Sequence, residues 1–81
     1  MNLRVRLFAQ MRIDAGADVL DLDLPEGATV EAALAELQSR HPAVARHLPT
    51  CMVAVALDYV DPQHRLQDAD ELSLVPPVQG G

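Results

Sequence analysis

The feature that most constrains the fold is an alternation of apolar and polar residues in two segments near the start of the sequence. Residues 3–8 read Leu-Arg-Val-Arg-Leu-Phe, and residues 19–24 read Val-Leu-Asp-Leu-Asp-Leu. A period of two residues places alternate side chains on opposite faces of a β-strand. Each segment therefore predicts a strand with one buried face. Together they predict an antiparallel hairpin with a long, irregular connection over residues 9–18.

One helical segment comes next in the sequence. The i, i+3, i+4, i+7 spacing of an apolar helix face is formed by Val30, Ala33, Leu34 and Leu37. Thr29 is the expected N-cap, because its side chain can accept a hydrogen bond from the first turn. Pro42 disfavours helical geometry at the residue before it, so we expect the helix to end near Arg40.

The second half of the sequence predicts two or three more strands. Residues 51–57 are almost all apolar, which is typical of a central strand covered on both faces. We expect its larger inward side chains to be Val53, Val55 and Leu57. Residues 59–60 are expected to start a short edge strand. Residues 71–75 predict the last strand, with its leucines directed inward.

The order of these elements, β-β-α-β-(β)-β, predicts an α+β domain with one face of the sheet covered by the helix. We expect a β-grasp (ubiquitin-like) fold, in which a mixed four- to five-stranded sheet packs on one main helix. Residues 1–75 are expected to form this domain, and residues 76–81 a flexible, extended C-terminal tail. A chain of 81 residues has room for only one hydrophobic core.

Charge and composition exclude several classes of partner. The chain has 12 acidic and 6 basic residues, which give a net charge of −6. Because nucleic-acid phosphates require clustered cations, we expect a basic protein surface as partner and no nucleic acid. The sequence has no apolar run near the roughly 20 residues of a membrane span, so we expect no membrane partner. The single cysteine, Cys51, favours a cytoplasmic location.

The last six residues, 76–81, read Pro-Pro-Val-Gln-Gly-Gly. Pro76 and Pro77 favour an extended backbone and cannot donate hydrogen bonds to a sheet. At roughly 3.3 Å per residue, the tail can reach about 20 Å from the domain. Gly80 and Gly81 have no side chains, so they can pass through a narrow channel. Many glycine-ended termini are simply frayed, but fraying requires neither a proline stem nor a slim tip.

Four segments carry a resemblance to a known family: Leu7-Phe8-Ala9-Gln10-Met11-Arg12, Thr29-Val30-Glu31, Asp70-Glu71-Leu72 and the tail 76–81. The chain resembles, over its whole length, the small sulfur-carrying subunits of molybdopterin synthase. These subunits are ubiquitin-like β-grasp sulfur carriers. A terminal Gly-Gly pair is shared by many ubiquitin-like carriers, whereas the first segment and the tail together are more specific.

The resemblance implies a role in molybdenum cofactor biosynthesis. An adenylyltransferase similar to ubiquitin-activating enzymes would use ATP to adenylate Gly81, and a sulfur donor enzyme would supply the sulfur of a thiocarboxylate. Gly80 would give the tail access to its partners. The thiocarboxylate would donate sulfur to the pterin precursor in the large subunit, within a heterotetramer of two small and two large subunits. The domain itself would bind no cofactor and perform no stand-alone catalysis.

Strand parity predicts where a partner docks. Phe8 falls on the outward face of the first strand, and Val75 on the outward face of the last. These two residues form an apolar anchor, or Phe8 instead covers a small second cluster beneath the connection that follows it. The resemblance adds Tyr59, as well as Arg12 as the contact for a partner carboxylate. The tail residues of the same contact are Pro76, Pro77 and Val78.

Other candidate residues favour structural roles. Cys51 begins the most apolar segment, and a thiol in such surroundings is usually inert. The histidines lack the spacing of metal ligands, and we expect them on the surface beside turns; they are His41, His47 and His64. We therefore predict no metal site.

Three alternative functions stay open. The same sulfur chemistry serves thiamine, thiolated tRNA bases or cysteine in other carriers. A ubiquitin-like modifier would instead join Gly81 to a target lysine through an isopeptide bond. A β-grasp binding module would have an unreactive tail. The chain has no lysine, which we attribute to an arginine-biased composition. The functional alternative is that no internal side-chain amine can capture an activated Gly81.

Overall fold

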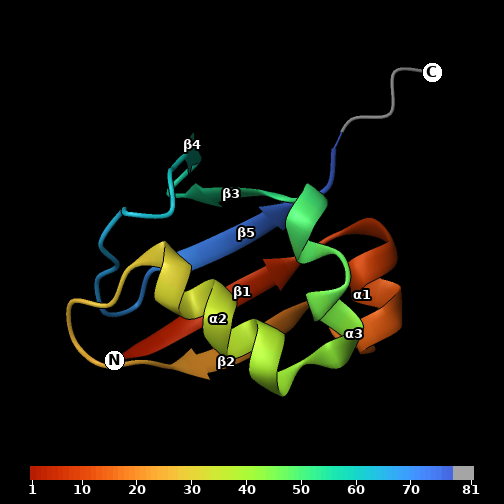
Figure 1. Ribbon diagram of the computed structural model, residues 1–81, viewed down its shortest axis with the longest axis horizontal. Helices are drawn as coiled ribbons and strands as arrows, with labels where there is room; N and C mark the ends of the chain where they lie inside the picture. Colours follow the sequence, from red (N-terminus) through yellow and green to blue (C-terminus); the bar gives the residue numbers. More distant parts are fainter. Residues whose placement is uncertain (78–81) are drawn as a thin grey trace.

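The computed structural model describes residues 1–77 and has a mixed sheet of five strands with the helix α2 across one face (Figure 1). The strands lie in the order β2-β1-β5-β3-β4. Their bounds are Asn2–Leu7 for β1, Val19–Asp23 for β2, Met52–Val55 for β3, Asp58–Tyr59 for β4 and Glu71–Val75 for β5. β1 and β5 are parallel neighbours, and the other pairs are antiparallel. This topology confirms the predicted β-grasp fold.

The main helix α2 spans Val30–Arg40 and begins and ends where the sequence predicts. Thr29 Oγ1 accepts a hydrogen bond from the backbone N–H of Ala32 at 3.3 Å, so the predicted N-cap is confirmed. Two further short helical segments follow, α3 at Pro42–Ala45 and the 3₁₀ turn η1 at Leu48–Thr50. Within residues 1–77 no helix is long and apolar enough to cross a membrane.

The core lies between α2 and the covered face of the sheet. The alternation predicted for the central strands is confirmed, because each of their inward residues is at most 2% exposed: Leu3, Val5, Leu7, Leu72 and Leu74. From α2, Val30, Ala33 and Leu37 complete the layer. Leu34 is only half-buried, since it lies at the margin of this face.

The connection over residues 9–18 differs from the prediction, because it contains the helix α1 at Ala9–Ala15. With seven residues and only Met11 buried, this helix is too short to show an apolar stripe in the sequence. Gly16 ends it in the left-handed conformation at φ 69° and donates its N–H to the carbonyl oxygens of Arg12 and Ile13. β1 and β2 still pair antiparallel, as predicted.

The apolar segment 51–57 also differs from the prediction. Only Met52–Val55 forms β3, and its outer neighbour β4 has two residues, so β3 is not a well-covered central strand. Val55 is buried and Val53 half-buried, but Leu57 is fully exposed. The reason is that the apolar run continues into the hairpin turn, where strand alternation no longer applies.

The chain between β4 and β5 leaves the sheet and crosses to the start of α2. The N–H of Glu31 donates to the carbonyl oxygen of Pro62 at 2.9 Å, and the N–H of Val30 donates to that of His64 at 2.9 Å. Leu66 then enters the core and is 3% exposed. This crossing makes β4 short and ties the loop to the helix. The chain returns to the sheet at β5, with the bounds that were predicted.

Candidate functional site

The base of the tail lies at one end of the two central strands. Because β1 and β5 run parallel, the C-terminal ends of both strands meet there (Figure 1). β5 ends at Val75; Pro76 is half-buried and Pro77 exposed. Of the predicted tail residues, Val78, Gly80 and Gly81 lie outside the described part of the chain.

Four apolar side chains lie on the open face of the sheet, extending from the base of the tail to β4. Val75 pairs with Met52 across β5 and β3, and Tyr59 pairs with Ala54, two residues further along β3. Met52 and Tyr59 therefore share the face of Val75, which settles the facing of Tyr59. Continuing the register Leu7↔Leu74 by one residue places Phe8 beside Val75. We call Phe8, Met52, Tyr59 and Val75 the docking patch.

Three side chains of the docking patch are exposed to solvent to different degrees. Phe8 is 39% exposed, Met52 49% and Tyr59 61%. Phe8 is thus the least exposed of these three side chains, and both predicted roles, an anchor or a cover for a second small cluster, stay predictions. Sequence reasoning missed Met52, although its alternation with Val53 was the available signal. An exposed apolar cluster of this kind is typical of a protein-docking surface.

Arg12 lies on α1, one turn beyond Phe8. Its side chain is 54% exposed, and its Nη1 atom is 3.7 Å from Asp18 Oδ1. Arg6, Phe8, Arg12 and Asp18 line a hollow of about 290 Å³ at this end of the sheet. A loosely held, half-exposed guanidinium beside the patch can donate two parallel hydrogen bonds to a carboxylate of a partner.

The open face becomes polar further from the tail. Arg6 Nε donates to Glu71 Oε1 at 2.8 Å across β1 and β5. This hydrogen bond lowers the pKa of Glu71. Both side chains are about 40% exposed, so the pair is worth little stability. It marks the polar limit of the apolar surface around the tail.

A polar cluster around Asp14 holds α1 against the segment after α3. Asp14 Oδ1 accepts a hydrogen bond from Gln10 at 2.8 Å, and Asp14 Oδ2 lies 2.7 Å from His47 Nε2 and also accepts from Arg46. The bond to His47, then those to Gln10 and Arg46, hold the pKa of Asp14 well below its usual range. The cluster fixes the helix that carries Arg12. His47 lies in the turn after α3, as predicted, but its side chain is only 24% exposed because it faces Asp14.

Cys51 has the structural surroundings that the sequence predicts. Its Sγ atom is 3.6 Å from Met11 Sδ, and the residue is half-buried. Burial raises the pKa of the Cys51 thiol, so the nucleophilic thiolate is scarce at neutral pH. Among residues 1–77, no three His, Cys, Asp or Glu side chains are grouped so that they could hold a metal ion.

Comparison with known proteins gives consistent relatives. Residues 5–81 match the ThiS family. The molybdopterin synthase sulfur carrier subunit of Chlamydomonas reinhardtii is 37% identical over 83 residues and covers 100% of both chains. The protein of the same name from Arabidopsis thaliana is 31% identical, over 100% of this chain and 84% of its own length.

Solved structures share the fold over nearly the whole chain. Small archaeal modifier protein 1 of Haloferax volcanii has a TM-score of 0.86 and 27% identity, and the match covers 95% of this chain and 98% of the other. A chain in the complex of subunits 1 and 2 of the molybdopterin-converting factor from Helicobacter pylori has a TM-score of 0.77 and 26% identity, with 100% of both chains covered.

Proposed function

Because this chain belongs to the ThiS family, we propose that it is the sulfur carrier subunit of a molybdopterin synthase and acts in molybdenum cofactor biosynthesis. The observation that carries this proposal is the match, over the full length of both chains, to a sulfur carrier subunit of that enzyme. The structure adds a surface suited to such a role, since the docking patch begins at the base of the tail. Cytoplasmic location is part of the proposal.

The proposed chemistry takes place at Gly81. Its carboxylate attacks the α-phosphate of ATP on an adenylyltransferase, pyrophosphate leaves, and an acyl adenylate forms. A hydrosulfide ion supplied by a donor enzyme attacks the acyl carbon, AMP and a proton leave, and Gly81 carries a thiocarboxylate. ATP belongs to the activating enzyme, and this domain holds no cofactor in the proposal. Gly80, which has no side chain, lets the tail enter a narrow active site.

The large subunit supplies the catalytic groups in this proposal. It docks on Phe8, Met52, Tyr59 and Val75, and one of its carboxylates contacts Arg12. Pro76 and Pro77 keep the start of the tail extended, and Val78 enters the partner with it. Docking holds the sulfur beside the pterin precursor, which makes the transfer effectively intramolecular.

The test is the intact mass of the carrier after incubation with the adenylyltransferase of the same host, ATP and a sulfur donor. We expect the mass gain that corresponds to the replacement of one oxygen by sulfur. A variant without Gly81 is the control and should show no gain. Gly81→Ala should also lose activation or transfer, because its methyl group occupies the channel. No gain in the unmodified chain with its own host enzyme would refute the proposal.

A second candidate function is that of a ubiquitin-like protein modifier. The structural likeness to a small archaeal modifier protein favours it. In that case Gly81 ends in an isopeptide bond to a lysine of another protein, since this chain has no lysine of its own. An immunoblot of a host lysate distinguishes the two functions. A ladder of conjugates that disappears when Gly81 is deleted supports the modifier, whereas a single small band supports the carrier.

A further inference from the structure

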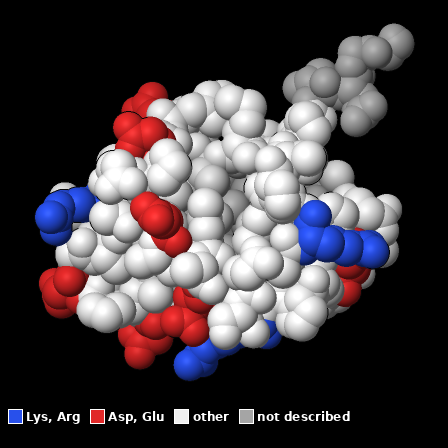
Figure 2. Space-filling view, viewed as in Figure 1, with Lys and Arg blue, Asp and Glu red and all other residues white. Residues whose placement is uncertain are grey.

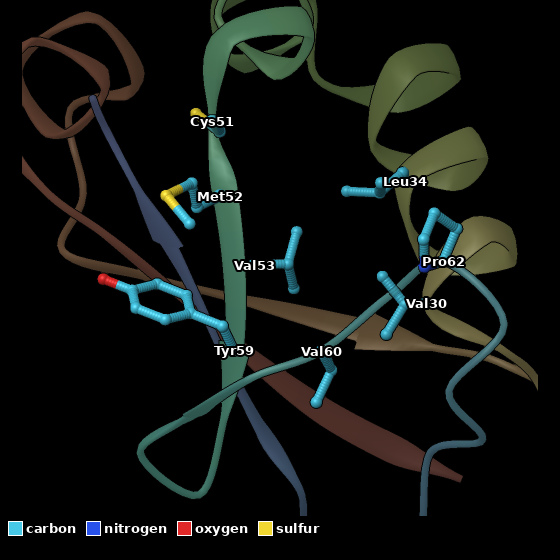
Figure 3. Close-up of a pocket in the computed structure, with 8 residues that line it drawn as sticks. All are labelled: Val30, Leu34, Cys51, Met52, Val53, Tyr59, Val60 and Pro62. Atoms are coloured by element: carbon cyan, nitrogen blue, oxygen red, sulfur yellow. The ribbon is translucent and has the colours of Figure 1, made fainter.

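A hollow of about 270 Å³ lies between α2 and the outer edge of β3 (Figure 3). Its apolar walls come from three elements: Leu34 and Val30 of α2, Val53 of β3, and Val60 with Pro62 after β4. Side chains from both sides point into the space between strand and helix. Most of this hollow lies on the helix side of the sheet.

The hollow exists because β4 ends early. β4 pairs with β3 only at Ala54 and Val55, and one more bond follows, from the N–H of Val60 to the carbonyl oxygen of Val53 at 3.0 Å. The chain then turns to α2 at Pro62. Within residues 1–77, no strand lies beside the outer edge of β3 at Met52. The hollow occupies the place that a longer β4 would fill.

The hollow is continuous with the docking patch. Met52 and Tyr59 belong to the patch, and they also line the rim of the hollow. Figure 3 shows their side chains on the other side of β3 from Val53 and Leu34. A partner that covers the patch therefore meets the hollow directly around the edge of β3.

The surroundings of the hollow are acidic. Glu31 begins α2 beside Val30, and Asp61 precedes Pro62; both are exposed. Glu31 Oε2 accepts a hydrogen bond from Gln63 Nε2 at 3.0 Å, so this carboxylate is held between the start of α2 and the loop after β4. Figure 2 shows carboxylates over β4 and over the start of α2, whereas the arginines in this view lie toward the margins. An apolar floor with an acidic rim favours an apolar segment flanked by basic residues.

We propose that an extended segment of the large subunit lies along the outer edge of β3 and inserts one large apolar side chain between Leu34 and Val53. The main chain of this segment would form hydrogen bonds with the outer edge of β3 where β4 ends, and its apolar side chain would fill the hollow. This inference rests on the proposed function, because the partner that docks on the patch is the one that reaches the hollow. The large subunit would then contact the carrier on both faces of β3, at the docking patch and in the hollow.

The first test changes the walls of the hollow and measures the affinity for the large subunit of the same host by calorimetry. Leu34→Gln makes one wall polar, and we expect the Kd to rise about tenfold, as for the loss of one buried anchor. Ala35→Gln is the matched control, because it introduces the same side chain at the next position of α2, which is exposed. We expect its Kd to rise no more than about twofold, as for a residue outside the contact. An equal Kd for Leu34→Gln and the unmodified chain would overturn the inference.

A second variant separates a binding site from a simple packing defect. Val53→Phe fills the hollow, so both interpretations predict a domain at least as stable to heat as the unmodified chain. Only a binding site predicts weaker binding as well, by about tenfold in Kd. A stable Val53→Phe variant with unchanged affinity would overturn the inference.

The single cysteine gives a direct readout of coverage. Cys51 lines the hollow, so its alkylation by N-ethylmaleimide should be slower in the saturated complex than in the free chain. An unchanged rate would refute coverage. If the unmodified chain gains sulfur and binds the large subunit while any one of the three measurements shows no effect, this inference fails and the proposed function stands. If the unmodified chain does neither, both fail.

Discussion

The turn between β3 and β4 places two side chains in a backbone region that favours glycine. Ala56 and Leu57 have φ angles of 52° and 72°, and they form a two-residue loop closed by the pair Val55 and Asp58. Positive φ at both central residues defines a type I′ turn, for which Asn-Gly is preferred. A side chain in the left-handed region costs about 1–2 kcal/mol per residue.

Leu57→Gly should therefore stabilise the domain. The side chain is 101% exposed, so its removal loses no buried apolar area. Relief of about 1–2 kcal/mol is offset by about 0.5–1 kcal/mol, because glycine has more conformational freedom in the unfolded chain. The net gain is about 0.5–1 kcal/mol, which raises the Tm by about 2–8 °C in a domain of this size. Urea unfolding followed by circular dichroism measures the free energy, and calorimetry measures the Tm.

The matched control is Leu57→Ala, which removes the exposed apolar group but keeps the Cβ atom. We expect its free energy of unfolding to stay within about 0.5 kcal/mol of the unmodified chain, as for most exposed substitutions. The double variant with Ala56→Asn should be at least as stable as Leu57→Gly alone. A glycine variant no more stable than the alanine variant would refute the strain that we assign to this turn.

Three further predictions concern the core, the patch and the polar cluster. Leu37→Ala, at a position 0% exposed, should lower the free energy of unfolding by about 2–5 kcal/mol, and Gln38→Ala on the exposed side of α2 should change it by less than about 0.5 kcal/mol. Phe8→Ser should raise the Kd for the large subunit about tenfold, with little change in Tm. The pKa of Asp14 is lower in the folded chain than its unfolded value of about 4, so the ionised side chain stabilises the fold above that pH. This stabilisation is lost progressively as the pH falls from about 4 toward the lowered pKa of the folded state. Asp14→Asn should therefore be less stable at pH 7, and urea unfolding at about pH 2 should show a smaller difference.

The strands and the main helix were predictable because their signals are local. In β1 and β5 every second residue enters one shared core, so Leu3, Val5, Leu72 and Leu74 are recognisable without knowledge of their neighbours. The cap of α2 is equally local, since the donor lies three residues from Thr29.

The elements that were missed depend on contacts between distant residues. α1 is held by Asp14, whose partners Arg46 and His47 are 32 and 33 residues away. The end of β3 was misplaced because Ala56 and Leu57 are apolar residues in a turn that usually has Asn-Gly. The hollow beside β3 results from the crossing at Pro62, and no residue pattern marks it.

The docking surface was predictable in part. Phe8 and Val75 followed from alternation along their strands, whereas Tyr59 came from a family resemblance. The register of β3 against β5 was needed to add Met52. The roles of these residues, and of Gly81, stay predictions until the binding and mass measurements are made.

The position of β5 determines how the domain responds to a force on its C-terminal tail. The tail continues from a strand held on both sides, by β1 and by β3, and not from a strand at the margin of the sheet. A pull along the tail is directed along the axis of β5, so the hydrogen bonds to both neighbours share the load in shear and do not open one after another. A force applied at the terminus is therefore carried by the strand at the centre of the sheet.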